Sequence, residues 1–357
     1  MNVCIAEGRR RPQTHIQFAE ELALRVIGQP AAVRAIAPWL DVHQAGLSPE
    51  GRPAGVFLLL GPTGTGKTRT VEAVADILHG SRRKMLKVDC GEFSQEHEVA
   101  RLIGAPPGYI GHRETAAYLS REALRAQTTP QCDLSIVLFD EIEKAAPSLT
   151  RLLLGILDKG TLRLGDNTAV SFEKTLIFFT SNLGAQKMDA ELRGGFGFAG
   201  SMPTDRHARE RRIEQISLHA MRKRFAPEFV NRIDSVIAYT PLDREALEAI
   251  FDLLLDDVQQ HIYARLGDRA FHLRVGPRVR SFLLGIGASD EYGARELKRT
   301  LQRHIVQPLA ALVAAGRIAP DSTIDLRIAG GRVAFAAANR SRAGLRTLSM
   351  GIPGSLI

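Results

Sequence analysis

The chain has 357 residues, a formal net charge of +8 and 45% hydrophobic residues, which is enough apolar material for two domains. No apolar run is long enough to cross a bilayer, and residues 1–16 lack the apolar centre of a signal peptide. Cys4, Cys90 and Cys132 are too scattered for a disulfide framework or a zinc cluster. We therefore expect a cytoplasmic globular protein without membrane contact.

The positive charge suits contact with nucleic acid or with an acidic partner. It is spread along the chain, however, with basic groups at residues 9–11, 206–212 and 222–224. None of these groups alternates with aromatic side chains on which bases would stack. We favour a solvated surface over nucleic-acid binding, and we keep the remodelling of nucleic acid as the alternative function.

The first part of the chain predicts two helices separated by a glycine turn. Residues 1–14 predict a disordered basic lead, and residues 17–26 have the apolar spacing of a helix. Residues 28–30 (Gly-Gln-Pro) end that helix and begin a second one, which runs through Leu40.

From Val56 to Tyr239, apolar runs with strand character alternate with amphipathic helices. This alternation predicts an α/β domain with a parallel sheet. The predicted strands cover residues 56–60, 85–88, 135–139, 175–180 and 235–238.

Pro241 begins a second, smaller module, in which Asp243 can cap a long helix over residues 244–264. Further helices are predicted near residues 278–285 and 294–315, with short strands near 271–275, 323–328 and 332–336. The expected organisation is a lead over 1–14, a large domain over 15–240, a small mixed α/β domain over 241–337 and a flexible tail over 338–357.

A glycine-rich turn lies between the first of these strands and a helix over residues 69–78. Glycines allow backbone N–H groups to point inward around a polyphosphate. Lys67 can reach the outer phosphates, and the hydroxyl of Thr68 can hold Mg²⁺. We predict that ATP and Mg²⁺ bind here, through Gly61, Pro62, Thr63, Gly64, Thr65, Gly66, Lys67 and Thr68.

A second motif follows the apolar run at residues 135–139, which is typical of a strand buried on both faces. Asp140 and Glu141 come at its carboxyl end, where phosphates meet a parallel sheet. We predict that Asp140 holds Mg²⁺, directly or through water, and that Glu141 orients and deprotonates the attacking water. The alternative is a pair of solvated acids at the end of a strand.

Seven fragments of the sequence resemble, in the same order, those of one family. They are Val26–Gln29, Gly61–Thr68, Gly104–Gly111, Leu138–Ala145, Thr180–Gly184, Phe225–Asp234 and Tyr292–Arg299. The chain resembles the Clp-type AAA+ protein unfoldases, in particular the second ATPase ring of ClpA, ClpB and ClpC. The resemblance implies an AAA+ P-loop NTPase domain followed by a small mixed α/β C-terminal domain. It further implies an ATPase, without a peptidase of its own, that forms a homo-hexamer and threads unfolded or tagged proteins through a central pore.

The resemblance assigns further residues to the nucleotide site, with Val26 and Ile27 beside the nucleotide. Asn182 is an uncharged amide suited to hold the attacking water, the role called sensor 1, and its alternative is a turn asparagine. Arg232 resembles the arginine finger that reaches the neighbouring subunit's γ-phosphate, and Arg295 resembles sensor 2. Without the resemblance, we would interpret either arginine as a surface salt-bridge residue.

Glycines flank an aromatic side chain in the turn over residues 107–111. By resemblance this turn lines the central pore, where Tyr109 and Ile110 would contact the translocating polypeptide. Residues 159–167 are similar to a second pore loop, and an ordinary hairpin explains them equally well.

Phe196-Gly197-Phe198 lies in a glycine-rich stretch. In family members that work with a peptidase, a loop at this place docks on a ClpP-like peptidase, although its first position is aliphatic or Met there. We favour docking over the alternative, in which both phenylalanines pack on their own domain.

The sequence lacks counterparts of a first ATPase ring, of a coiled-coil middle domain and of the zinc module of ClpX, so we expect a single ring. Recruitment of clients is left open: the basic ends would select acidic clients or an adaptor, or would serve only as solubilising tails. A non-catalytic scaffold that assembles on ATP is a further alternative, and the presence of Glu141 and Arg232 argues against it.

Overall fold

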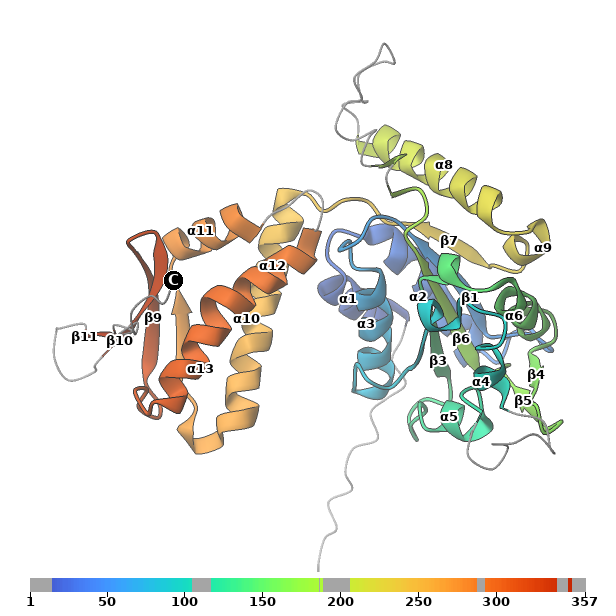
Figure 1. Ribbon diagram of the computed structural model, residues 1–357, viewed down its shortest axis with the longest axis horizontal. Helices are drawn as coiled ribbons and strands as arrows, with labels where there is room; N and C mark the ends of the chain where they lie inside the picture. The colour runs from blue at the N-terminus through green and yellow to red at the C-terminus, as the bar shows by residue number, and fades with distance from the viewer. Residues whose placement is uncertain are drawn as a thin grey trace, which may run out of the picture. The chain divides into compact units, whose positions relative to one another are not determined.

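The computed structural model describes residues 15–104, 117–185, 187–188, 206–287, 293–338 and 346–348. The chain divides into two compact units, Met1–Pro241 and Leu242–Ile357 (Figure 1). Within the described residues, no helix combines the length and the apolar character that a membrane span requires.

A parallel sheet forms the centre of the first unit, with the strand order β2-β3-β6-β1-β7. All five predicted strands are present, and the α/β class with a parallel sheet is confirmed. The strands are β1 (Gly55–Leu60), β2 (Leu86–Asp89), β3 (Ser135–Asp140), β6 (Thr175–Ser181) and β7 (Ser235–Ala238).

The central strands are buried and mostly apolar because helices cover both faces of the sheet. Every residue of β1 and β6 is buried. On one face Phe57 stacks on Phe178, and on the other Phe139 stacks on Phe179, with ring centroids 5.0 and 5.4 Å apart. The sheet therefore separates two apolar cores.

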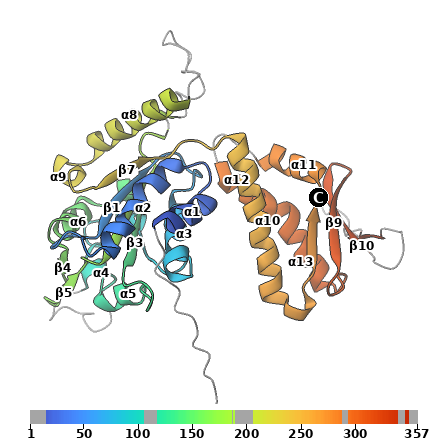
Figure 2. The ribbon, with the colours of Figure 1, turned by 180° about the vertical axis from the view of Figure 1, so that it is seen from behind.

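Three helices contribute to the core that contains Phe57, namely α1 (His15–Arg25), α2 (Pro30–Gln44) and α3 (Lys67–His79), and they are grouped together in Figures 1 and 2. The opposite core includes side chains from α4 (Ala100–Ile103), α5 (Arg121–Arg125), α6 (Pro147–Lys159), α8 (Arg206–Arg224) and α9 (Pro227–Val230). Short 3₁₀ turns, η1 (Cys90–Phe93) and η2 (Ile142–Lys144), follow β2 and β3. Burial, with a smaller contribution from Asp89, raises the pKa of the Cys90 thiol, which fits a packing residue rather than a nucleophile.

Residues 159–167 contribute to an antiparallel hairpin after α6. Its strands are β4 (Thr161–Arg163) and β5 (Ala169–Ser171). Asn167 has a φ of 69°, in the left-handed region that Asn tolerates better than most residues. The hairpin alternative is therefore correct for the backbone, and a role in a pore stays a prediction.

The second unit combines helices with a four-stranded mixed sheet in the order β11-β10-β9-β8. Asp243 caps its long first helix, because its carboxylate accepts a hydrogen bond from the N–H of Ala246 at 2.8 Å. The elements are α10 (Arg244–Leu266), η3 (Gly267–Arg269), β8 (His272–Val275), α11 (Pro277–Gly287), α12 (Gly293–Leu301), η4 (Gln302–Val306), α13 (Gln307–Ala314), β9 (Thr323–Ala329), β10 (Arg332–Ala338) and β11 (Arg346–Leu348).

The pattern predicted one helix over residues 294–315, and this prediction is wrong in its detail. The π-helical turn η4 separates α12 from α13. Pro308 has no N–H to donate, and its ring would collide with a carbonyl of the preceding turn in a regular helix. The wider turn directly before this proline accommodates both effects.

Candidate nucleotide-binding site

The glycine-rich turn joins β1 to α3, and its backbone has the conformation that glycine permits. Gly64 and Gly66 have φ values of 82° and 101°. Gly66 is the N-cap of α3, so no side chain caps the first N–H groups of this 13-residue helix. Lys67 and the half-buried Thr68 form the first turn of the helix. Together these features fit a phosphate group held by backbone N–H donors and a helix N-terminus.

Gly61 opens the turn at a position that has no room for a side chain. Its φ is 152°, and a Cβ atom there would lie 2.6 Å from the carbonyl oxygen of Tyr239 and 2.7 Å from its Cβ. Tyr239 cannot move aside easily, because it is fully buried and its hydroxyl donates a hydrogen bond to Thr70 at 2.7 Å. Gly61 is thus required by the close approach of the chain that follows β7.

Gly61→Ala is expected to lower the free energy of unfolding by about 2 kcal/mol or more, through this clash and the distortion that relieves it. Gly46→Ala is the matched control, because Gly46 has a positive φ of 68° but no atom within 4 Å of an added Cβ. The control should lose only about 1 kcal/mol, from the strained φ. Urea unfolding of both variants measures the difference, and equal losses would mean that the contact with Tyr239 is unimportant.

Lys67 joins the turn to the end of β6. Its ammonium group is buried and donates hydrogen bonds to the carbonyls of Gly61 and Pro62 at 2.6 and 2.7 Å. It also donates to the side-chain oxygen of Asn182 at 2.9 Å. Thr63 donates to that same oxygen at 3.5 Å. The structure therefore brings Lys67 and Asn182 together, as expected for one site.

Asp140, at the end of β3, forms an ion pair with a lysine of the neighbouring strand. Its Oδ2 lies 2.7 Å from the ammonium group of Lys87 on β2, and its Oδ1 accepts a hydrogen bond from the hydroxyl of Thr180. Burial opposes ionisation, but these two hydrogen bonds outweigh it, and the pKa of Asp140 is lowered. An ionised carboxylate is the form that binds a divalent cation.

Glu141 has a left-handed backbone, with φ 56° and ψ 49°, which is uncommon for a residue other than glycine. This turn directs the chain away from the strand directly after Asp140. The Oε1 of Glu141 accepts a hydrogen bond from the amide of Asn182 at 3.3 Å, and its Oε2 pairs with Lys144 at 2.5 Å. Lys67, Asn182 and Glu141 thus form one connected group.

Val26 and Ile27 follow α1, and the first is buried while the second is half-buried. Gln29 ties this segment to the phosphate loop, because its amide nitrogen donates to the carbonyls of Thr65 at 3.2 Å and of Thr240 at 2.8 Å. Its amide oxygen accepts from the N–H of Thr240 at 3.2 Å. The prediction did not include Gln29, although the residue belongs to the first of the seven fragments.

The predicted arginines have different surroundings. Arg232 follows α9 and forms an ion pair with Asp158 near the end of α6, with both side chains partly exposed. Arg295 belongs to the second unit and is exposed on α12. The remaining predicted site residues, Tyr109, Ile110, Phe196, Gly197 and Phe198, lie outside the described residues.

A parallel α/β sheet with a phosphate loop after β1 and an acid pair at the end of β3 defines a P-loop nucleotide-binding domain. The family model of the AAA domain (Cdc48 subfamily) matches residues 52–236. That of the C-terminal D2-small domain of ClpB matches residues 242–326. The chain belongs to the AAA domain family, and the resemblance to the Clp-type proteins is confirmed. Membership implies that a nucleotide binds.

ClpB chaperones are among the proteins that the chain is similar to. The chain is 39% identical over 329 residues to the chaperone protein ClpB of Pseudomonas putida, covering 92% of this chain and 35% of the relative. It is 37% identical over 331 residues to ClpB of Lactiplantibacillus plantarum, covering 93% and 35%. The chain thus spans about a third of the length of the curated relatives it matches.

Solved structures of Hsp104 share the fold. The S. cerevisiae Hsp104–ADP complex has a TM-score of 0.72 and 29% identity, covering 88% of this chain and 51% of that one. A closed-state reconstruction of Hsp104 with ATPγS and FITC-casein has a TM-score of 0.74 and 28% identity, covering 91% and 52%.

Proposed function

We propose that this protein is an ATP-driven unfoldase or remodelling chaperone that works as a homo-hexameric ring. The observation that carries the proposal is the connected group of Lys67, Asn182 and Glu141, which lie on the segments that follow the neighbouring strands β1, β6 and β3. A phosphate-binding cation, a water-positioning amide and a carboxylate base are the parts that ATP hydrolysis requires. The ClpB and Hsp104 relatives support the coupling of this chemistry to polypeptide.

The phosphate loop and the start of α3 would hold the phosphates of the nucleotide, with Lys67 beside the outer ones. Val26 and Ile27 would lie beside the rest of the nucleotide. Thr68 and Asp140 would hold Mg²⁺, since hydroxyl and carboxylate oxygens are ligands that this ion prefers. When bound there, Mg²⁺ would supply positive charge beside the phosphates.

Glu141 is proposed to accept the proton of the attacking water, and Asn182 to orient that water. Arg232 is proposed to act on the nucleotide of the neighbouring protomer, and Arg295 to respond to the nucleotide state from the second unit. In keeping with the first of these roles, Arg232 forms an ion pair with Asp158 of α6 within its own chain. The proposed hydrolysis therefore requires protomers to assemble into a ring.

Tyr109 and Ile110 are proposed to contact extended polypeptide in the central pore. Phe196, Gly197 and Phe198 are proposed to dock on a ClpP-like peptidase, and the basic segments to select an adaptor or acidic clients. The cytoplasmic location expected from the scattered cysteines stays a prediction.

The test is the rate of ATP hydrolysis against protein concentration, with and without casein as an unfolded polypeptide. We expect a rate per protomer that rises with concentration, because the finger is supplied in trans, and that casein increases further. Tyr109→Ala should lose the casein stimulation and retain basal hydrolysis. Tyr263→Ala is the matched control, because Tyr263 is an exposed tyrosine of the second unit.

Hydrolysis that ignores both casein and the Tyr109 substitution would contradict the unfoldase proposal. Stimulation by DNA or RNA instead of casein would favour the nucleic-acid remodelling alternative. Binding of ATP with assembly but no hydrolysis would favour a scaffold.

A further inference from the structure

Thr180 is a buried polar residue next to the two acidic residues at the end of β3. It belongs to β6, and the pairing of Phe139 with Phe179 places it beside Asp140 across the neighbouring strand. Only 1% of Thr180 is exposed. A buried hydroxyl needs hydrogen-bond partners, and the partners here belong to Asp140 and Glu141.

The hydroxyl of Thr180 makes two hydrogen bonds, whose directions follow from the chemistry of the groups. The backbone N–H of Glu141 can only donate, and it donates to Thr180 Oγ1 at 3.0 Å. The single hydroxyl hydrogen is therefore free to donate to Asp140, and it does so at Oδ1.

We propose that Thr180 is a positioning residue for the reaction, which sets both Asp140 and Glu141 through one hydroxyl group. It fixes the Oδ1 atom of Asp140, and with it the direction of the carboxylate that would hold Mg²⁺. It also holds the N–H of Glu141, which stabilises the left-handed turn from which that side chain projects. The proposal rests on the ATPase function proposed above.

Lys87 contacts the same carboxylate but has a different role. Its side chain is 44% exposed, whereas Thr180 is buried within the strand. An exposed ammonium group on a flexible stem can move away when a cation arrives, and a buried β-branched residue cannot. Thr180 is thus the fixed partner of Asp140, and Lys87 is the exchangeable one.

The test compares variants that separate the hydroxyl from the shape of the side chain. Thr180→Val keeps the shape and removes both hydrogen bonds, whereas Thr180→Ser keeps the hydroxyl. Thr175→Val is the matched control, because Thr175 is equally buried in the same strand and its hydroxyl forms a hydrogen bond with that of Ser135 at 2.8 Å. Thr175 lies at the opposite end of β6 from the site.

Two measurements are made on each variant. The first is kcat and KM for ATP, and the second is the Mg²⁺ concentration that half-saturates binding of a fluorescent ADP derivative, with EDTA as the metal-free reference. For Thr180→Val we expect kcat to fall at least about tenfold and the half-saturating Mg²⁺ concentration to rise several-fold, with unchanged binding in EDTA. Thr180→Ser and Thr175→Val should both remain within about threefold of the wild type.

Wild-type kcat and wild-type Mg²⁺ dependence in Thr180→Val would overturn the proposal. An equal loss in Thr180→Ser, or in Thr175→Val, would also overturn it, since the hydroxyl at position 180 would then not be the cause. If the wild type binds the derivative but hydrolyses no ATP, the proposed function fails. The Mg²⁺ dependence of binding still decides the role of Thr180 in that case.

Discussion

Glu141→Gln is expected to hydrolyse ATP at least about 10²-fold more slowly than the wild type while it binds nucleotide with similar affinity. The amide of Gln keeps the size and polarity of the side chain but cannot accept the proton of the attacking water. Fold stability should change little, because Glu141 is partly exposed and its ion-pair partner, Lys144, lies at the surface. Single-turnover hydrolysis and binding of a fluorescent ADP derivative measure the two effects separately.

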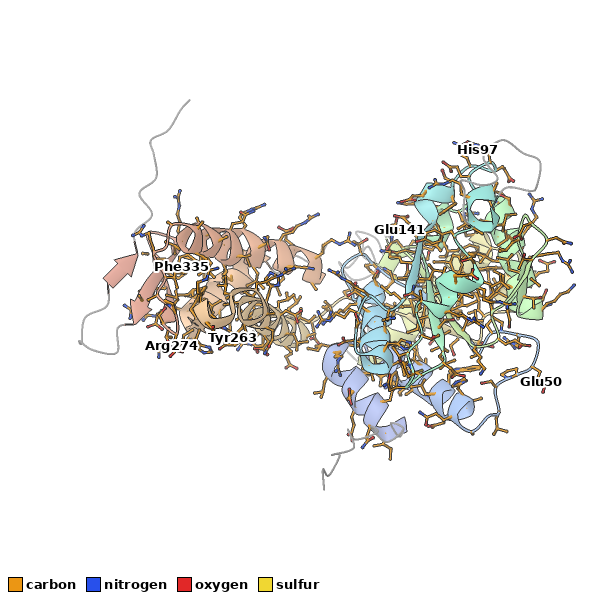
Figure 3. All side chains as sticks on the ribbon, turned by 90° about the horizontal axis from the view of Figure 1, so that it is seen from below. Glu50, His97, Glu141, Tyr263, Arg274 and Phe335 are labelled. Carbon is orange, nitrogen blue, oxygen red and sulfur yellow. The ribbon has the colours of Figure 1, made fainter. Side chains whose placement is uncertain are left out.

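The matched control is Glu50→Gln, a substitution of the same kind at an exposed residue well separated from Glu141 in Figure 3. It should hydrolyse ATP at the wild-type rate. We also expect Glu141→Gln, loaded with ATP, to retain casein through gel filtration, because release requires hydrolysis in the proposed cycle. Turnover of Glu141→Gln at a rate near that of the wild type would exclude Glu141 as the base.

Arg232→Ala is expected to lower kcat by about 10³-fold or more, the effect of losing an arginine finger supplied in trans. Nucleotide binding to the isolated protomer should be retained, because within its own chain the guanidinium pairs with Asp158. Loss of that partly exposed ion pair should cost no more than about 1 kcal/mol of stability. The rate of ATP hydrolysis and the midpoint of urea unfolding measure the two effects.

Mixing two inactive variants tests whether the finger acts between protomers. A site in an Arg232→Ala protomer keeps its own Glu141 and can receive Arg232 from a neighbouring Glu141→Gln protomer. Activity should therefore return when the two proteins are mixed and allowed to exchange subunits. A mixture that stays inactive, in rings shown to contain both variants, would place Arg232 in the site of its own chain. Arg151→Ala is the control, as an exposed arginine of α6 that should leave the rate unchanged.

The difference between prediction and structure is largest where one residue changes the regularity of an element. The apolar pattern over residues 294–315 gives no sign that a π-helical turn precedes Pro308. Arg232 is a different case, because the surface salt bridge considered from sequence is present, with Asp158 as the partner. Tyr109 and Phe196 lie outside the described residues, so their roles stay predictions.

The class of the protein and the main parts of its site could be predicted from the order of the residues alone. The phosphate loop from Gly61 to Thr68 is contiguous, and its function depends on local backbone freedom, which sequence displays directly. The same holds for Asp140 and Glu141, since a continuous apolar run marks the buried strand that they follow. Both motifs could therefore be recognised without knowing the order of the strands in the sheet.

Which side chains support those motifs depends on how the strands are arranged in the folded chain. Thr180 is 40 residues from Asp140, and Gln29 is 211 residues from Thr240, yet each pair is joined by hydrogen bonds. Such contacts follow from the strand order β2-β3-β6-β1-β7, which is set by how helices pack on both faces of the sheet. Local patterns do not carry that order, because neighbours in a parallel sheet are brought together by long crossover connections.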